Sequence, residues 1–190
     1  MTDTGLVIGA DGKARCFWGG ASPDYAEYHD TEWGRPVRGD DALFERLTLE
    51  AFQSGLAWIT ILRKRPAFRA AFDNFSIAKV AAYTEDDAAR LMADPGIVRN
   101  RMKVDAALHN AKVAAGLDEG LSTLLWSFAP AARPRPRTRA DVPAVTAEST
   151  ALAKALKKRG FKFVGPTTAY ALMQATGMVD DHLADCWVPA

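Results

Sequence analysis

The chain has 190 residues, of which 48% are hydrophobic and 25% are charged, and its net charge is +1 at pH 7. This is the composition of a globular protein with one domain or two small lobes. No apolar run is long enough to cross a membrane, the N-terminus lacks a signal-peptide core, and two cysteines argue against a secreted disulfide scaffold, so we expect a cytoplasmic protein without membrane contact. The near-neutral charge does not itself predict a nucleic-acid partner, which would have to bind a local cluster of cations.

Residues 1–14 contain glycine and aspartate without periodicity. We expect them to form a flexible extension to a single domain that covers residues 15–190. Ser22 followed by Pro23 then predicts the cap and the first turn of a short helix.

The next predicted helix starts at two aspartates and runs to Gly55. Leu43, Leu47 and Glu50 fall on one stripe of it, at i, i+4 and i+7. An acid on an apolar stripe breaks the amphipathic pattern, and such breaks tend to mark functional sites. Glu50 is therefore a candidate functional residue.

Further short helices follow along the chain. They are predicted over residues 57–62, 66–72, 77–83, 84–93, about 97–115 and 121–128, with a proline ending the first of them and a capping box starting the fourth. No sustained alternation of apolar and polar residues indicates a strand, so the fold class is predicted to be all-α.

Residues 129–145 form the clearest connecting segment. Four prolines alternate there with Arg133, Arg135, Arg137 and Arg139. Prolines at this density preclude a helix and favour an extended conformation. We favour a solvated linker here over a segment that tracks a phosphate backbone.

Two glycines separate a pair of predicted helices near the C-terminus. Residues 151–159 and 167–176 have helical composition, with Gly160 and Gly165 between them and Pro166 at the start of the second helix. The cations that crowd this helix–hairpin–helix are Lys154, Lys157, Lys158, Arg159 and Lys162. Exposed amides, a helix start and local cations suit a phosphate, although a helical hairpin with a solvated basic face fits equally well.

Two cysteines and two histidines lie near the two ends of the chain. Cys16 and His29 are near one end, and His182 and Cys186 are spaced i, i+4 near the other. Two thiolates and two imidazoles make a closed tetrahedral zinc site, which is structural because no position is left for water. Such a site would join the two ends of the chain. The alternative is two core cysteines with unrelated histidines.

Aromatic residues cluster in the same early part of the chain as Glu50. They are Trp18, Tyr25, Tyr28, Trp33 and Trp58, and Tyr25, Tyr28 and His29 share one helix face. Each alone is more often a core residue. Together with an acid they describe a stacking pocket with one anion in its wall, which suits a flat or cationic ring.

These residues resemble a known family. The segments that carry the resemblance are Cys16-Phe17-Trp18, Tyr25-x-x-Tyr28-His29-Asp30-x-Glu32-Trp33-Gly34, Leu49-Glu50-x-x-Gln53-x-Gly55-Leu56-x-Trp58-Ile59, Trp126-Ser127-Phe128, residues 157–165 and Asp181-His182. They are similar to those of 3-methyladenine DNA glycosylase I, over nearly the whole chain.

The resemblance implies a helix-hairpin-helix glycosylase fold. In it the hairpin would bind DNA, with Gly160, Lys162, Gly165 and Thr167 as its contact residues. It also implies a zinc clasp at the two cysteines and two histidines, and a 3-methyladenine pocket at Tyr28, Glu50 and Trp58 with Trp18, Tyr25 and Trp33 around it.

The activity implied is monofunctional excision of 3-methyladenine from alkylated double-stranded DNA by a monomer, with Glu50 as the catalytic residue. We expect Tyr28 and Trp58 to stack on the extruded base while the Glu50 carboxylate accepts hydrogen bonds from its edge. Gly55 and Leu56 would fill the gap left by the base, unless Leu56 is a core residue. Asp181 is interpreted first as a support for the neighbouring histidine or as a helix cap.

Two other functions compete with this one. A zinc-stabilised DNA-binding module without catalysis would retain the hairpin and the clasp but has no use for Glu50 on an apolar stripe. A zinc hydrolase needs an open coordination position, which four protein ligands deny it.

Overall fold

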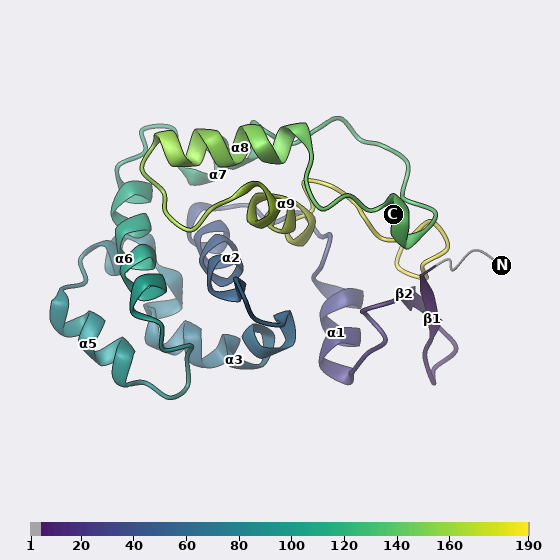
Figure 1. Cartoon of the computed structure of the whole chain (residues 1–190), viewed down its shortest axis with the longest axis horizontal. Coiled ribbons are helices and arrows are strands. Elements are labelled where there is room, and N and C mark those ends of the chain that lie inside the picture. The colour runs from purple at the N-terminus through teal and green to yellow at the C-terminus, as the bar shows by residue number, and fades with distance from the viewer. Residues whose placement is uncertain (1–4, 190) are drawn as a thin grey trace.

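The computed structural model describes residues 5–189, and over this range the protein is mostly helical (Figure 1). The helices are α1 (Pro23–Thr31), α2 (Asp40–Gln53), α3 (Trp58–Ala71), α4 (Ile77–Ala81), α5 (Glu85–Ala93), α6 (Arg101–Ala115), α7 (Leu121–Trp126), α8 (Ala147–Lys158) and α9 (Pro166–Ala175), with two 3-10 turns, η1 (Asp73–Phe75) and η2 (Arg139–Asp141). The strands are β1 (Leu6–Ile8) and β2 (Ala14–Cys16). None of the helices in the described range is both long and apolar enough to span a membrane.

The N-terminal segment is folded where the structure describes it, which corrects the expected flexible extension and the all-α prediction. β1 and β2 pair antiparallel, with Leu6 opposite Cys16 and Ile8 opposite Ala14. Strands of three residues are too short to give a period in the sequence, so the pattern could not predict them. Residues 1–4 of the expected extension lie outside the described residues.

The helix starts predicted at Ser22, Thr84 and Pro166 are confirmed, whereas α6 begins later than predicted, at Arg101, and α8 begins earlier, at Ala147. The Ser22 hydroxyl accepts a hydrogen bond from the Tyr25 amide at 3.3 Å, and Thr84 and Asp87 form the capping box of α5. Pro166 occupies the first turn of α9, where its missing amide hydrogen costs nothing.

Pro66 does not end a helix, contrary to the sequence-based prediction. It lies inside α3, which runs without interruption from Trp58 to Ala71. Ile61 on one side of the proline and Phe68 on the other are both fully buried in the same core. Packing of both halves therefore outweighs the loss of one backbone hydrogen bond.

The core is built around α2. This helix contacts α3, α6, α7 and α9, and Figure 1 shows it in the middle of the molecule with α8 and α9 above it and α3 below. Phe44 and Phe52 of α2 make edge-to-face ring contacts with Phe68, Phe72 and Phe75. Glu50 is also buried on α2, on the stripe that carries Leu43 and Leu47 rather than on the side of these phenylalanines.

A smaller apolar cluster joins the two ends of the chain. Cys16 of β2 packs there with Leu183, Cys186 and Val188. The Trp187 amide donates to the Ala14 carbonyl at 2.8 Å. The two ends of the described chain, β1 and the segment around Val188, consequently lie at the same end of the molecule (Figure 1).

The Pro/Arg segment between α7 and α8, residues 129–146 (the strap), is held by side-chain contacts, which corrects the solvated linker. Arg133 pairs with Asp181 at 2.7 Å. Arg135 pairs with Asp180 at 2.7 Å and also donates to the Val188 carbonyl at 2.6 Å. The strap is therefore fastened to the C-terminal segment that follows α9.

One glycine controls how α9 meets the loop after α1. Gly177 has φ of +69°, and a Cβ there would lie 2.6 Å from backbone atoms of Arg35 and Pro36. Gly177→Ala should therefore lower the free energy of unfolding both through the left-handed backbone (about 1–2 kcal/mol) and through overpacking (about 1–3 kcal/mol).

Gly12→Ala is the matched control, because Gly12 has φ of +76° with nothing within 4 Å of the added Cβ. It should lose only the backbone part in urea unfolding. Equal losses in the two variants would contradict the close approach at Gly177.

Candidate functional site

A cavity of about 510 Å³ lies between the N-terminal helices, α9 and the strap. This volume is in the range of small-molecule sites. Its wall contains all six residues expected to bind the base, Trp18, Tyr25, Tyr28, Trp33, Glu50 and Trp58. The sequence prediction thus assembles into one pocket, from residues on α1, α2, α3 and the loops beside α1.

The aromatic rings of the pocket contact one another. The Trp18 ring meets the Tyr25 and Trp33 rings edge to face, with centroids 5.8 and 5.0 Å apart. The Tyr28 and Trp58 centroids are 5.5 Å apart with planes tilted by 45°. A flat ring that lies between two others needs roughly 3.5 Å on each side, so no base fits between the Tyr28 and Trp58 rings. A base in this pocket can therefore stack against one of the two rings but not between them.

Two of these aromatic residues also contribute to the fold, Tyr25 through a hydrogen bond and Tyr28 through its burial. The Tyr25 hydroxyl accepts a hydrogen bond from the Ile59 amide at 3.0 Å and so caps α3, which has no side-chain cap of its own. Tyr28 is only 3% exposed. The indole nitrogen of Trp58 is buried without a hydrogen-bond partner in the described part of the chain, and it is therefore available to a ligand acceptor.

Glu50 is a buried acid without a partner. It is 6% exposed, and among residues 5–189 its carboxyl group makes no hydrogen bond or ion pair. Burial raises its pKa to about 8, and the charge of Arg46 opposes this only in part. Arg63 pairs with Asp24 and Arg65 pairs with Glu32, so neither basic residue neutralises Glu50.

Glu32, the neighbour of the pocket residue Trp33 in the sequence, is in contrast paired and has a lowered pKa. Burial would raise its pKa, but hydrogen bonds from Arg65 and Arg46 outweigh burial and lower the pKa to about 2. Its two oxygens receive these bonds at 2.6–2.9 Å. Glu32 is thus a satisfied structural anion, whereas Glu50 is not.

Asp181 lines the cavity but is fully engaged. One carboxylate oxygen accepts from Arg133 at 2.7 Å, and the other accepts from the Tyr170 hydroxyl and from Gln174 at 2.9 Å. Burial and the bond to Asp181 raise the pKa of Tyr170. With three donors, Asp181 joins the strap to α9 and fixes the chain directly before His182.

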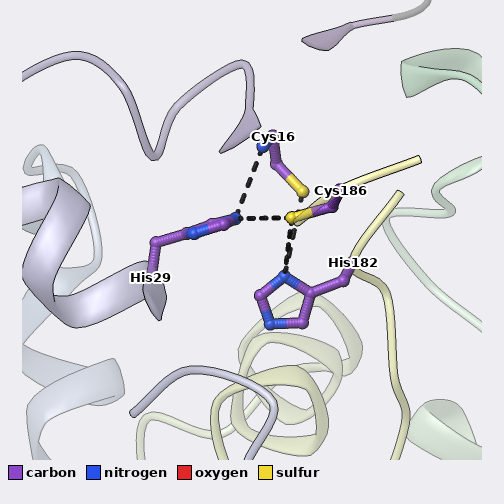
Figure 2. A group of neighbouring side chains, drawn as sticks. All are labelled: Cys16, His29, His182 and Cys186. Atoms are coloured by element: carbon purple, nitrogen blue, oxygen red, sulfur yellow. Dashed lines mark hydrogen bonds between the residues drawn. The ribbon is translucent and has the colours of Figure 1, made fainter. Parts of the chain in front are cut away.

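The two cysteines and two histidines come together in one buried cluster (Figure 2). Their ligand atoms all lie within 4.8 Å of one another. Cys186 Sγ is 3.6 Å from His29 Nε2 and 3.7 Å from His182 Nδ1, and Cys16 Sγ is 4.0 Å from His182 Nδ1. The cysteines form no disulfide, so the group could hold a metal ion.

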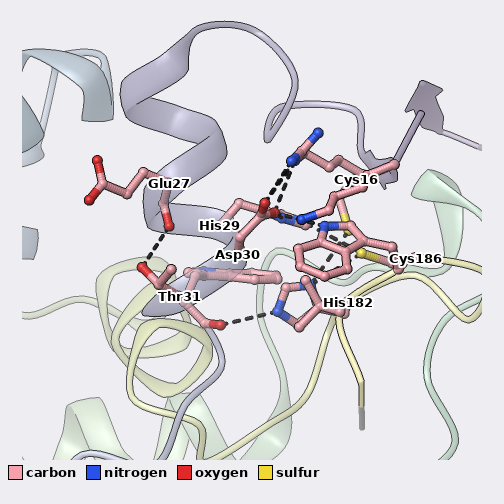
Figure 3. Close-up of polar contacts among 12 residues, drawn as sticks. Cys16, Glu27, His29, Asp30, Thr31, His182 and Cys186 are labelled. Atoms are coloured by element: carbon pink, nitrogen blue, oxygen red, sulfur yellow. Dashed lines mark hydrogen bonds and ion pairs between the residues drawn. The ribbon is translucent and has the colours of Figure 1, made fainter. Parts of the chain in front are cut away.

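Neighbouring groups orient both histidines (Figure 3). His29 Nδ1 lies 2.8 Å from an Asp30 oxygen, and Asp30 also receives bonds from Arg15 and Trp187. The second histidine, His182, directs its Nε2 toward the Trp33 carbonyl at 3.1 Å. A carboxylate or carbonyl behind each imidazole is the usual arrangement around a bound metal.

The glycine hairpin between α8 and α9, residues 160–165 (the hairpin), is exposed at its tip. Lys162 and Phe163 are exposed, and Phe163 has φ of +58°, unusual for an aromatic residue. Gly165 is the N-cap of α9 without a side-chain cap, and Thr167 beside it is exposed. The start of α9 therefore has no side-chain cap, whereas the amides of Gly160, Phe161 and Lys162 are already hydrogen-bonded.

Five cations without an acidic partner were expected around the hairpin, and one of them, Arg159, does have a partner. Arg159 pairs with Glu119 at 2.8 Å. No carboxylate of the described residues pairs with the remaining four, Lys154, Lys157, Lys158 and Lys162.

The loop between α2 and α3, residues 54–57 (the wedge loop), is exposed throughout. Gly55 has φ of +78°, and Leu56 is 40% exposed. Leu56 is therefore not a core residue, which removes the alternative considered from the sequence.

The cavity also has walls that the sequence did not predict. They are Gln53, Arg139, Val142, Pro143, Ala144, Ala171, Gln174 and Leu183. Gln53 lies three residues after Glu50 on α2, a spacing that could have indicated it. The strap and α9 residues reach the pocket only through long-range contacts that no local pattern carries.

Comparison with known proteins shows which family this chain is similar to. The family model described as methyladenine glycosylase matches residues 18–189. DNA-3-methyladenine glycosylase of Haemophilus influenzae is 46% identical over 90% of this chain and 96% of its own, and DNA-3-methyladenine glycosylase 1 of Escherichia coli K12 is 45% identical over 90% and 95%. A structure of 3-methyladenine DNA glycosylase I from Staphylococcus aureus, solved for its recognition of 3-methyladenine, is similar with a TM-score of 0.87 at 38% identity, over 93% of this chain and 97% of that one.

Proposed function

The chain belongs to the methyladenine glycosylase family, and from this premise we propose that it is a DNA repair enzyme that excises 3-methyladenine from alkylated DNA. The single observation that carries the proposal is Glu50, a buried carboxyl group without a partner in a pocket of aromatic rings. A binding module without catalysis has no use for such a group, because it only destabilises the fold.

The reaction is hydrolysis of the bond between the base and its sugar. The nucleotide leaves the stack and enters the pocket, at a lower cost for a damaged base than for a normal one. Methylation at N3 gives the base a positive charge, so the electrons of the breaking bond neutralise the base as it departs. Water then bonds to the sugar carbon that the base has left and gives up a proton to solvent. No side chain of the protein bonds to the sugar, so the enzyme is monofunctional.

Recognition follows from the pocket walls. We assign stacking of the base to the open face of one pocket ring. The candidates for this ring are Trp58 and Trp18, which are both half-buried. The carboxylate of Glu50 accepts hydrogen bonds from the base edge, and a cationic base lowers the cost of its buried charge. Uncharged adenine gains less from either contact, which gives selectivity.

The Cys16–His29–His182–Cys186 cluster fits a structural zinc ion. Tetrahedral zinc with sulfur at about 2.3 Å and nitrogen at about 2.0 Å separates its ligand atoms by roughly 3.4–3.8 Å, close to the 3.6–4.0 Å found between sulfur and nitrogen here. Four protein ligands leave no open position, so the ion would contribute stability and no chemistry. The same closed set argues against a zinc hydrolase.

DNA contact is assigned to two exposed elements. The pair α8–α9 with the hairpin would act as a helix-hairpin-helix element, with the amides at the start of α9 and the unpaired lysines facing phosphates. The wedge loop would place Leu56 in the gap left by the base. The pocket and the cluster are complete within one chain, which supports a monomer, and we assign it to the cytoplasm.

The decisive test is Glu50→Gln, which retains shape while removing the charge. Affinity for free 3-methyladenine should fall by about tenfold or more, because a charge-assisted hydrogen bond contributes on the order of 1.5–3 kcal/mol. Excision from alkylated duplex should fall with it. Calorimetric titration and release of methylated base measure the two effects.

The same variant should be more stable at high pH. Because the pKa of Glu50 is raised to about 8, its contribution to stability is full below its usual pKa of about 4.5 and falls as the pH rises to 8. Glu50→Gln should have the same melting temperature as the wild type at pH 4 and a higher one at pH 8.

Glu32→Gln is the control for both tests, and it should lose stability at pH 7 and retain base affinity. A Glu50→Gln protein with unchanged affinity would refute the assignment.

Zinc is tested with Cys186→Ala. The wild type should contain about one zinc per chain by elemental analysis, and the variant should lose it and melt lower, because the ends of the chain are no longer joined. Val188→Ala removes apolar contacts from the same cluster without a ligand, so it should retain zinc. Stoichiometric zinc in Cys186→Ala would rule out the clasp.

The hairpin is tested with Lys162→Ala. If Lys162 neutralises one phosphate, the slope of log affinity against log salt should flatten by about one unit, equally for damaged and undamaged duplex. Lys79→Ala makes the same change in net charge on α4, where Lys79 lies 3.5 Å from Asp73, and should leave the slope unchanged. An unaltered slope in Lys162→Ala would place this lysine off the DNA.

A further inference from the structure

Helix α6 carries a buried lysine that bonds only to backbone. Lys103 is 8% exposed, and its ammonium donates to the carbonyls of Phe52 at 2.9 Å and Ser54 at 2.6 Å. Phe52 belongs to the last turn of α2, and Ser54 is the C-cap of α2 and the first residue of the wedge loop. A cation is favourable there because the last carbonyls of a helix lack partners within it.

Further along α6, two side chains hold the hairpin. Asn110 is 2% exposed, donates to the Lys162 carbonyl at 3.0 Å and accepts from the Lys162 amide at 2.8 Å. His109 Nε2 lies 2.8 Å from the Gly160 carbonyl and must donate, since a carbonyl only accepts. The hairpin backbone is therefore fixed to α6 at two residues.

These contacts lie at a fixed spacing. Lys103 and Asn110 are seven residues apart, which puts them on one face of the helix and separates them by roughly 10 Å along its axis. The wedge loop and the hairpin are far apart in the sequence, and the described hydrogen bonds connect both of them to this one face.

We propose that α6 sets the position of the wedge loop relative to the hairpin, with Lys103 and Asn110 as positioning residues for excision from duplex DNA. This rests on the proposed function, in which the two loops contact the DNA. A hairpin on a phosphate and Leu56 in the gap must fit one duplex at the same time, and an error of about 1 Å in such placement is enough to cost rate.

Stability alone explains these residues poorly. No carboxylate of residues 5–189 pairs with Lys103, and burial lowers its pKa, so the ammonium is held there at a cost. An apolar residue would avoid the cost of a buried charge but would leave the Phe52 and Ser54 carbonyls without this donor. Both polar groups instead bond to backbone that leads directly to an exposed side chain, Leu56 or Lys162.

The test compares two variants of similar shape, Asn110→Leu and Lys103→Met. Asn110→Leu and Lys103→Met should each lower kcat/KM for alkylated duplex about tenfold, because either loss disturbs the shared placement of the two loops. Lys103→Met should lose little on the same sequence alkylated as a single strand, which has no gap to fill. Affinity for free 3-methyladenine should stay within about threefold in both.

Asn100→Ala is the matched control. Asn100 caps α6 by accepting from the Lys103 amide, so its removal lowers stability without touching either loop. It should retain both kinetic constants. If Asn110→Leu and Lys103→Met also retain them, or if Asn100→Ala at equal melting temperature shows the same losses, the inference is overturned. Failure of the wild type to release 3-methyladenine would instead refute the proposed function.

The double variant tests the shared position. If α6 holds the wedge loop and the hairpin in one relative position, the loss of either contact already disturbs that position. The loss in kcat/KM of the double variant should then be smaller than the product of the two single losses. A full product would mean two independent supports and would overturn the coupling.

Discussion

The site depends on a constraint that joins the two ends of the chain. The ligand atoms of Cys16, His29, His182 and Cys186 lie within 4.8 Å of one another, although they come from opposite ends of the sequence. One side of the pocket belongs to the N-terminal part, including Trp18 and the residues of α1, and the other belongs to α9 and the segment after it. The cavity therefore exists only while the two ends remain together. The four residues could hold a metal ion, which would strengthen a contact that otherwise rests on two short apolar segments.

Two glutamates illustrate how the protein separates folding from function. Glu32 has two arginine partners and a pKa lowered to about 2, whereas Glu50 has no partner in the described chain and a pKa raised to about 8. The first stabilises the fold around neutral pH and the second reduces its stability. A group that must bind a ligand edge has to be left unsatisfied in the free protein, and the large core around α2 tolerates that cost.

The parts of this structure that sequence predicts are those set by local chemistry. Ser22 and the capping box at Thr84 fix helix starts, and Glu50 was detectable because an acid breaks an apolar stripe. Pro66 misled the prediction, since burial of both halves of α3 outweighs a local rule. The pairing of Arg133 with Asp181 has no local signal, nor does the contact between the Tyr28 and Trp58 rings. Such features depend on distant segments meeting, and a single sequence does not encode them as a pattern.

Two unsatisfied groups among the described residues lie in the pocket wall, where a ligand could satisfy them. Glu50 and the indole nitrogen of Trp58 lack partners within the described chain, and both belong to the pocket wall. Asp181, another residue of that wall, is in contrast fully bonded, with three donors to its carboxylate. A surface that must read a base precisely needs its own groups free and its supports rigid. In the proposed function, selectivity would come from wall groups that cannot move to satisfy themselves, because the strap and the joined ends of the described chain hold the segments that carry them.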